Sequence, residues 1–223
     1  MNKYLTPKKI YEGQAVYNRL MLTIYDLFVL KFSNHLIWKC PLKDILTHYN
    51  LNISNNHLDV GVGTGYFLDN CNFSINYPRI ALLDINTNCL KATAKRIKRF
   101  NPEILPAANI LEPLEIPGSS FDSIGINYVL HCLAGSIHEK SVVFNHLKKF
   151  LNPGGVIFGS TLLNKGVKIS KNAKIAMYIY NNWIKSFHNN DDSLNDFKNA
   201  MKNNFYESKI KVIGNAILFS GRI

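Results

Sequence analysis

A glycine-rich turn that follows a short apolar run is the feature that most constrains the fold of this chain. The run at 57–60 leads into Gly61, Gly63 and Gly65, and glycines at this spacing permit a tight strand-to-helix turn that a ligand can approach closely. Such turns hold nucleotides or nucleosides. Residue 66 is tyrosine where the dinucleotide fingerprint needs a third glycine, and no Gly-Lys-Ser/Thr follows, so the match to a nicotinamide or flavin site is imperfect and a P-loop is excluded.

The segments around this turn alternate between short apolar runs and amphipathic runs. Strands are predicted at 57–60, 79–84, 123–128 and 156–161, and helices at 67–71, 89–100, 140–150, 171–188 and 193–203. Because the strands are apolar throughout, we expect a parallel sheet covered on both faces. The segments 209–213 and 216–220 are joined by Gly-Asn, which predicts a closing antiparallel hairpin.

The N-terminal region has a helical pattern of its own. Leu20, Ile24 and Leu27 recur at spacings of three and four residues, and Pro41 opens a second predicted helix that ends near residue 48. No repeat or low-complexity linker separates these helices from the strands.

The motif D-V-G-V-G-T-G at 59–65 resembles the first motif of class I S-adenosylmethionine-dependent methyltransferases. Asp84 stands 19 positions after Gly65, where this family carries an acid that binds both ribose hydroxyls, and a carboxylate can accept two such hydrogen bonds. The resemblance further places Ile85 on the adenine face and Asn109 and Ile110 at the adenine edge. Asparagine replaces the usual aspartate at position 109, which keeps an acceptor and loses a charge.

Two later segments extend the resemblance. Residues 121–132 are similar to the family's fourth-strand motif, in which Asn127 and Tyr128 would frame the sulfonium end, and 151–155 is similar to its L-x-P-G-G turn. The likeness spans about residues 55–165. It implies an α/β three-layer αβα sandwich with a seven-stranded, mostly parallel sheet ending in an antiparallel hairpin strand. It also implies S-adenosylmethionine as cofactor, S-adenosylhomocysteine as product, and binding contacts from the whole turn, including Asp59 and Val60.

The same resemblance divides the chain into a helical lid over the substrate, 1–50, and a catalytic domain, 51–223. The lid would line the acceptor pocket with aromatic side chains, namely Tyr11, Tyr17, Tyr25 and Trp38, although aromatic side chains at helical spacing more often belong to a core. If several of these rings face the cleft, the methyl acceptor is a small apolar or aromatic molecule.

His131 is the histidine that the motif places near the methyl donor. With an ordinary pKa near 6.5 it could take a proton from a hydroxyl or amine acceptor, or it could pack beneath the site or orient a backbone carbonyl. Methyl transfer by direct displacement from a sulfonium needs little acid-base assistance, because in-line positioning in a dry pocket supplies most of the acceleration.

The charge raises an alternative acceptor, because the formal net charge is +11 and basic proteins attract nucleic acids. The excess comes from 21 lysines against 5 arginines, whereas nucleic-acid recognition favours arginine. The N/D-P-P-Y/F motif of amino-directed nucleic-acid methyltransferases is also missing at 127–130. We therefore expect a small-molecule acceptor. A non-catalytic S-adenosylmethionine-binding module remains the other alternative.

The cysteines indicate the compartment. Cys40, Cys71, Cys89 and Cys132 lie far apart without paired spacing, which argues against a zinc site and a disulfide framework and favours a reducing cytosol. The most apolar stretch, 20–30, is shorter than the roughly 20 residues of a membrane span. We expect an intracellular, cytoplasmic enzyme with no metal and no membrane insertion.

Overall fold

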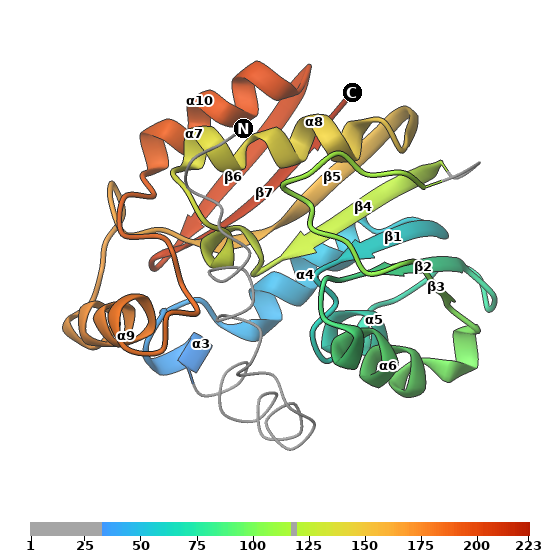
Figure 1. Cartoon of the computed structure of the whole chain (residues 1–223), viewed down its shortest axis with the longest axis horizontal. Coiled ribbons are helices and arrows are strands. Elements are labelled where there is room, and N and C mark those ends of the chain that lie inside the picture. The colour runs from blue at the N-terminus through green and yellow to red at the C-terminus, as the bar shows by residue number, and fades with distance from the viewer. Residues whose placement is uncertain (1–32, 117–119) are drawn as a thin grey trace.

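The computed structural model describes residues 33–116 and 120–223, and its centre is a seven-stranded sheet in the order β3-β2-β1-β4-β5-β7-β6 (Figure 1). Neighbours from β3 to β5 pair in parallel, and β7 is antiparallel to both β5 and β6. The strands are β1 Asn56–Val60, β2 Arg79–Leu83, β3 Glu103–Ile104, β4 Phe121–Asn127, β5 Leu151–Leu162, β6 Glu207–Ile213 and β7 Ala216–Arg222. The predicted sheet is confirmed.

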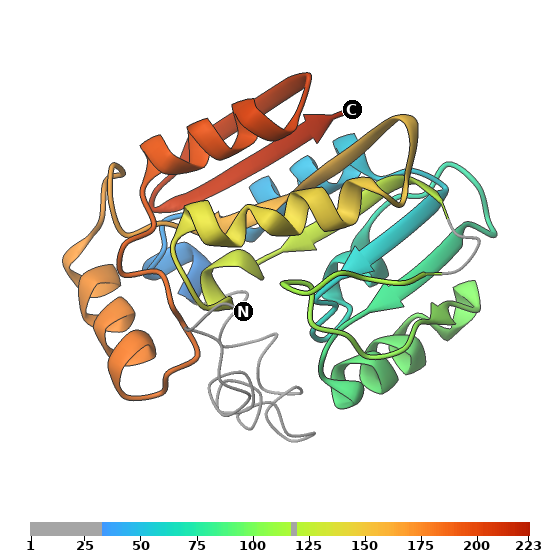
Figure 2. The same ribbon diagram turned by 45° about the horizontal axis from the view of Figure 1, so that its top comes forward.

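Helices cover both faces of this sheet (Figure 2). One face packs against α4, α5 and α6, and the other against α8 and α10, while α9 stands beyond the end of the sheet. The helices are α3 Asn34–Leu36, α4 Leu42–Asn52, α5 Tyr66–Asn70, α6 Thr87–Arg96, α7 Ile137–Lys140, α8 Val142–Lys148, α9 Lys171–Asn182 and α10 Leu194–Asn204, with 3₁₀ turns η2 Lys98–Phe100 and η3 Leu130–Cys132.

The uniformly apolar strands explain the layered arrangement. Along β2, Ala81 and Leu83 pack into the core beneath α8, while Ile80 and Leu82 pack into the core beneath α6. A strand in the middle of a parallel sheet buries both of its faces, so every position needs an apolar side chain. Burial of each Ile or Leu contributes about 1.5–3 kcal/mol.

Several element boundaries differ from the predicted ones. Strand β3 was not predicted, because it has only two residues and both are exposed at the sheet edge. The predicted helix 140–150 begins earlier, at α7, where Ser136 and Glu139 form a capping box, and it continues as α8 after Ser141. The predicted helix 171–188 stops with α9 at Asn182.

The first 50 residues, predicted as a lid, divide into two parts in the structure. The helical pattern at 10–30, with Tyr11, Tyr17 and Tyr25, lies outside the described residues. Helix α4 lies within the same predicted range and packs against β5 and β7 as part of the sandwich. No helix among the described residues is long and apolar enough to cross a membrane.

The hairpin between β6 and β7 turns at Gly214, as the sequence predicted. This glycine has φ +60°, and a Cβ there would overlap the carbonyl of Trp38 and lie 2.8 Å from Lys39 Cβ. A glycine at the first central position of a two-residue turn is typical of type II′ hairpins. The turn thereby also fastens the segment before α4 to the sheet end.

Candidate active site

The three glycines of the turn after β1 do not all have the same role. All have positive φ, +68° at Gly61, +53° at Gly63 and +73° at Gly65, a region that side chains disfavour. A Cβ on Gly61 would overlap Val129, and one on Gly65 would lie 2.8 Å from Thr93 Cγ2. No atom of the other described residues lies within 4 Å of a Cβ on Gly63. The turn therefore packs tightly at both ends and presents an open backbone in its middle.

Asp84 lies beside that open backbone. It follows β2 directly, and its Oδ2 accepts a hydrogen bond from the Gly63 amide at 3.4 Å while Oδ1 accepts from the Asn86 amide at 2.8 Å. Burial raises the pKa of Asp84 to about 6, although both amides act in the opposite direction. The half-buried Asp84 carboxylate therefore places two hydrogen-bond acceptor oxygens next to the glycine turn.

A buried polar chain supports the turn from below. Asp59 Oδ1 accepts from the Tyr49 hydroxyl at 3.2 Å, Tyr49 lies 3.1 Å from His57 Nε2, and His57 Nδ1 lies 2.8 Å from Ser123 Oγ. Because the single Tyr49 proton goes to Asp59, the contact between Tyr49 and His57 requires His57 to donate from Nε2. Asp59 is thus held in a buried polar chain within β1, directly before the turn, and Val60 is buried in the sheet core.

The carboxyl end of β4 lies on the other side of the turn. Asn127 Oδ1 accepts from Ser160 Oγ at 3.0 Å, which fixes the amide, while its buried Nδ2 has no hydrogen-bond partner among residues 33–116 and 120–223. Tyr128 adopts φ +56°, and its hydroxyl donates to Asn34 Oδ1 at 2.7 Å. An unpaired buried donor is costly, and a non-glycine residue in this backbone region is strained. Both features are typical of binding sites.

The residues predicted to contact the adenine differ in how exposed they are. Asn109 is part-exposed, and its Oδ1 accepts from the Leu111 amide at 3.1 Å while its Nδ2 donates to Glu112 at 3.2 Å. Ile110 is buried in the core beneath α8, and its carbonyl accepts from His146 Nδ1 at 3.0 Å. Ile85 is partly buried directly after Asp84.

His131 lies in η3 and is buried. Its Nδ1 is 3.2 Å from Thr161 Oγ1. Burial, together with the nearby Lys140 charge, lowers the pKa of His131 to about 3. The imidazole is therefore neutral throughout the physiological range and weakly basic, which corresponds to the packing alternative for this residue.

Two aromatic side chains that the sequence did not indicate, Phe187 and Tyr180, lie on one side of this histidine. Phe187 packs edge-on to the His131 ring, with centroids 4.5 Å apart, and stacks on Tyr180 at 4.6 Å. Trp38 is only 3% exposed and packs behind both of them at 6.1 and 6.3 Å. Tyr180 and Phe187 are half-buried. Both fall within the predicted helix 171–188, where no spacing signal distinguishes them from the other apolar residues.

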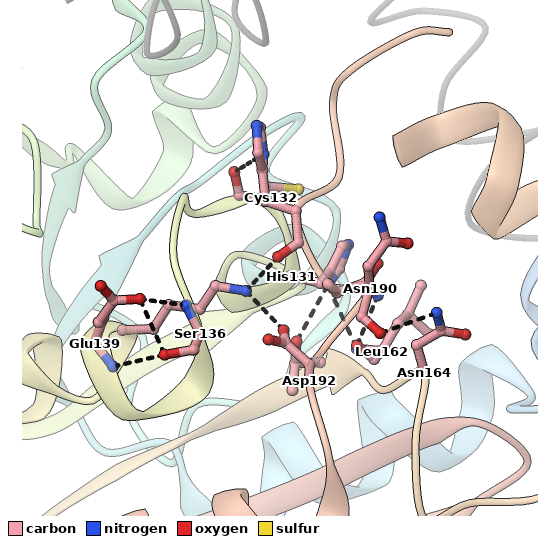
Figure 3. Close-up of polar contacts among 12 residues, drawn as sticks. His131, Cys132, Ser136, Glu139, Leu162, Asn164, Asn190 and Asp192 are labelled. Atoms are coloured by element: carbon pink, nitrogen blue, oxygen red, sulfur yellow. Dashed lines mark hydrogen bonds and ion pairs between the residues drawn. The ribbon is translucent and has the colours of Figure 1, made fainter. Parts of the chain in front are cut away.

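A buried ion pair holds the segment that carries Phe187 (Figure 3). Lys140 Nζ lies 2.7 Å from Asp192 Oδ2 and donates to the His188 carbonyl at 2.8 Å, and both charged side chains are 1% exposed. The His188 amide in turn donates to the His131 carbonyl at 2.8 Å. The end of α7, the segment between α9 and α10, and η3 are thereby joined through one polar cluster.

Comparison with known proteins identifies the family. A family model described as a methyltransferase domain matches residues 58–157, which contain the glycine turn, Asp84 and the end of β4. The chain is 39% identical over 202 residues to demethylluteothin O-methyltransferase of Streptomyces thioluteus, covering 91% of this chain and 87% of the relative. It is 38% identical to the physcion biosynthesis cluster O-methyltransferase of Aspergillus chevalieri, covering 96% of each. The chain belongs to the class I S-adenosylmethionine-dependent methyltransferases.

The fold of this methyltransferase agrees with the assignment. The N-methyltransferase NodS of Bradyrhizobium japonicum WM9, solved with S-adenosylhomocysteine, superimposes with a TM-score of 0.58 at 15% identity, covering 91% of this chain and 96% of that one. S-adenosylmethionine is the methyl donor of the family, and the described residues fit it. The open backbone at Gly63, the Asp84 carboxylate and the unpaired Asn127 Nδ2 all lie at the carboxyl ends of adjacent parallel strands, at the point where the strand order reverses.

Proposed function

We propose that this methyltransferase methylates a small apolar or aromatic molecule on a hydroxyl oxygen. The observation that carries the proposal is the half-buried aromatic pair Tyr180 and Phe187, which stacks beside His131 close to the carboxyl end of β4. Apolar walls with few polar groups are typical of small-molecule sites. The names of the two curated relatives, both O-methyltransferases, support oxygen as the acceptor atom.

We propose the following roles for the cofactor residues. Asp84 holds the ribose hydroxyls, the backbone at Gly61, Gly63 and Gly65 receives the amino-acid end, and Asn127 Nδ2 donates to the ligand. Ile85 and Asn109 contact the adenine, with Ile110 as support from the core, and Tyr128 frames the methionine end. When bound, S-adenosylmethionine supplies an activated methyl group on a sulfonium for direct displacement. The residues of this chain bind and orient the reactants and exclude water.

His131 has a positioning role in this proposal. Its low pKa and burial make it a poor acceptor of the substrate proton at neutral pH. The neutral ring instead supports Phe187, and the His131 carbonyl holds the His188 amide. Trp38 likewise acts from behind the aromatic pair, as a core residue.

We further propose that residues 1–32 form a lid over the acceptor pocket, to which Tyr11, Tyr17 and Tyr25 contribute. Asn34, at the start of the described chain, accepts a hydrogen bond from Tyr128 at the end of β4. The chain therefore enters the described structure beside the site. The four cysteines are free thiols, which supports a cytoplasmic location.

The proposal is tested by incubating small-molecule extracts and total RNA with the enzyme and methyl-labelled donor. We expect label in an apolar small molecule, shown by mass spectrometry to be on oxygen, with stoichiometric release of S-adenosylhomocysteine. Asp84→Ala should abolish the label at low donor concentration. Label in RNA would overturn the small-molecule assignment. Donor binding by calorimetry without any turnover would indicate a non-catalytic binding module.

A further inference from the structure

Helix α9 carries large apolar side chains on its outward face as well as on its buried face. Its inner face is buried through Ala173 and Met177. On the outer face, Ile175 is 61% exposed and Tyr178 is 59% exposed, and Trp183, which continues the helical turn after Ile179, is 74% exposed. Figures 1 and 2 both show α9 at the periphery of the molecule, beyond the end of the sheet.

Lysines accompany these apolar side chains along the sequence, and no acidic residue lies among them. The segment 166–190 contains four lysines and no aspartate or glutamate. All four are exposed, namely Lys168, Lys171, Lys174 and Lys185. The nearest acids along the chain, Asp191 and Asp192, are each engaged with a lysine at 2.7 Å. We call the four lysines together with Ile175, Tyr178, Trp183 and Ile184 the α9 patch.

We propose that the α9 patch binds the surface of a membrane that contains anionic phospholipids. A helix that lies in the interface inserts its apolar face to a shallow depth, and it gains further affinity when its lysines meet anionic headgroups. Tryptophan and tyrosine are the side chains that favour this interfacial depth. The lysine stems can lie along the apolar surface while their ammonium groups remain among the headgroups.

The charge pattern favours lipid over the other possible occupants of the patch. A second copy of the chain carries a formal net charge of +11 and would be repelled by the lysines. Residues 1–32 contain five basic and two acidic side chains, so they do not complement the patch either. Single-stranded nucleic acid is anionic and could stack on Tyr178 and Trp183, but it would leave the exposed side chains of Ile175 and Ile184 without an apolar partner, whereas a lipid interface covers all four.

Helix α9 also connects the α9 patch to the acceptor pocket, an inference that rests on the proposed function. Tyr180 projects from the same helix and stacks on Phe187. A membrane bound on the outer face of α9 would therefore lie close to the aromatic wall of the acceptor pocket. An apolar acceptor dissolved in lipid could then reach the site with little exposure to water.

The test uses the full chain and sedimentation with vesicles. We expect binding to vesicles of phosphatidylglycerol and phosphatidylcholine at low ionic strength, and a steep loss of binding to pure phosphatidylcholine or at high salt. Because the chain has two tryptophans and Trp38 is buried, a blue shift of tryptophan fluorescence on adding vesicles reports Trp183.

Matched variants separate the α9 patch from net charge. Lys171→Gln/Lys174→Gln should weaken vesicle binding about fivefold for each lysine, whereas Lys198→Gln/Lys202→Gln, two exposed lysines of α10, should change it little. Tyr178→Ser/Trp183→Ser should abolish the binding, and Tyr206→Ser, at a tyrosine that is 98% exposed on another surface, should not. Donor binding by calorimetry should be unchanged in every variant.

Three outcomes would overturn the proposal. These are no binding to anionic vesicles at low salt, equal losses in the α9 and α10 lysine variants, and tight binding to polyuridylate with none to vesicles. Methyl transfer is measured separately on each variant in detergent-free buffer. Loss of vesicle binding with intact methyl transfer therefore tests the α9 patch alone, while failure of methyl transfer in the wild type bears on the proposed function alone.

Discussion

Removal of the Lys140 ammonium should be among the most damaging single substitutions in the described chain. In Lys140→Met, the Asp192 carboxylate would lose its ion-pair partner in a region where both side chains are 1% exposed. Its second oxygen, Oδ1, is already buried and receives no hydrogen bond from the described part of the chain. Breaking a buried pair of this kind costs about 3–5 kcal/mol. Because neither carboxylate oxygen would then be paired, and the His188 carbonyl would also lose its donor, we expect the upper part of that range.

Urea unfolding with linear extrapolation measures this cost, and the chain offers a matched control. Lys165 and Asp191 are joined at the same 2.7 Å but are 56% and 79% exposed, so Lys165→Met should leave the free energy of unfolding close to wild type. Lys140→Met/Asp192→Leu, which removes both charges, should recover most of the loss. If Lys140→Met cannot be purified in folded form, a folded Lys140→Met/Asp192→Leu variant still shows that the loss comes from the unpaired Asp192 charge.

The pH dependence gives a second check on the same reasoning. Burial already raises the pKa of Asp192 to about 6 while the lysine acts to lower it, so removal of the lysine must raise this pKa further. Protonation then neutralises the stranded carboxylate at low pH, and the cost of Lys140→Met should be smaller at pH 5 than at pH 8. A cost below about 1 kcal/mol, or an equal cost at both pH values, would refute the buried-charge argument.

Four further outcomes follow from the site. Asp84→Ala should weaken S-adenosylmethionine binding by about 1.5–3 kcal/mol, the usual loss for hydrogen bonds to a charged group, and unchanged affinity in calorimetry would contradict the ribose assignment. The raised pKa of Asp84 is about 6, and the ribose hydroxyls of the donor favour the ionised carboxylate. The affinity of the wild type for S-adenosylmethionine should therefore fall as the pH drops below 6 and stay level above 7. Asp84→Asn should remove this pH dependence. Gly61→Ala should lower the melting temperature more than Gly63→Ala, because only the former overlaps Val129, whereas Gly63→Ala should chiefly weaken donor binding. His131→Asn should slow turnover less than tenfold and leave the shape of its pH profile unchanged, whereas loss of a general base would cost about a hundredfold or more.

Much of the fold could be predicted because its signals are local. The apolar strands, the glycine turn and the Gly-Asn hairpin each encode their geometry within a few neighbouring residues. The spacing from Gly65 to Asp84 was equally informative, since one helix and one strand fix the distance between neighbouring strand ends. The structure accordingly brings Asp84 Oδ2 to 3.4 Å from the Gly63 amide.

The wall of the proposed acceptor pocket could not be predicted, because the residues that position it lie far apart in the sequence and follow patterns that are also typical of ordinary surface segments. Lys140 follows a capping box in an amphipathic stretch, where a lysine would normally face solvent, and its partner lies 52 positions away. Only the packing of α7 against α10 brings the two charges together and buries them. The His188 carbonyl bonded to this lysine, and the His188 amide bonded to η3, then set the place of Phe187. The side chains that would select the substrate are therefore positioned by a tertiary contact, whereas those proposed to bind the donor are positioned by the ends of strands. This difference explains why the cofactor could be inferred from the sequence and the acceptor could not.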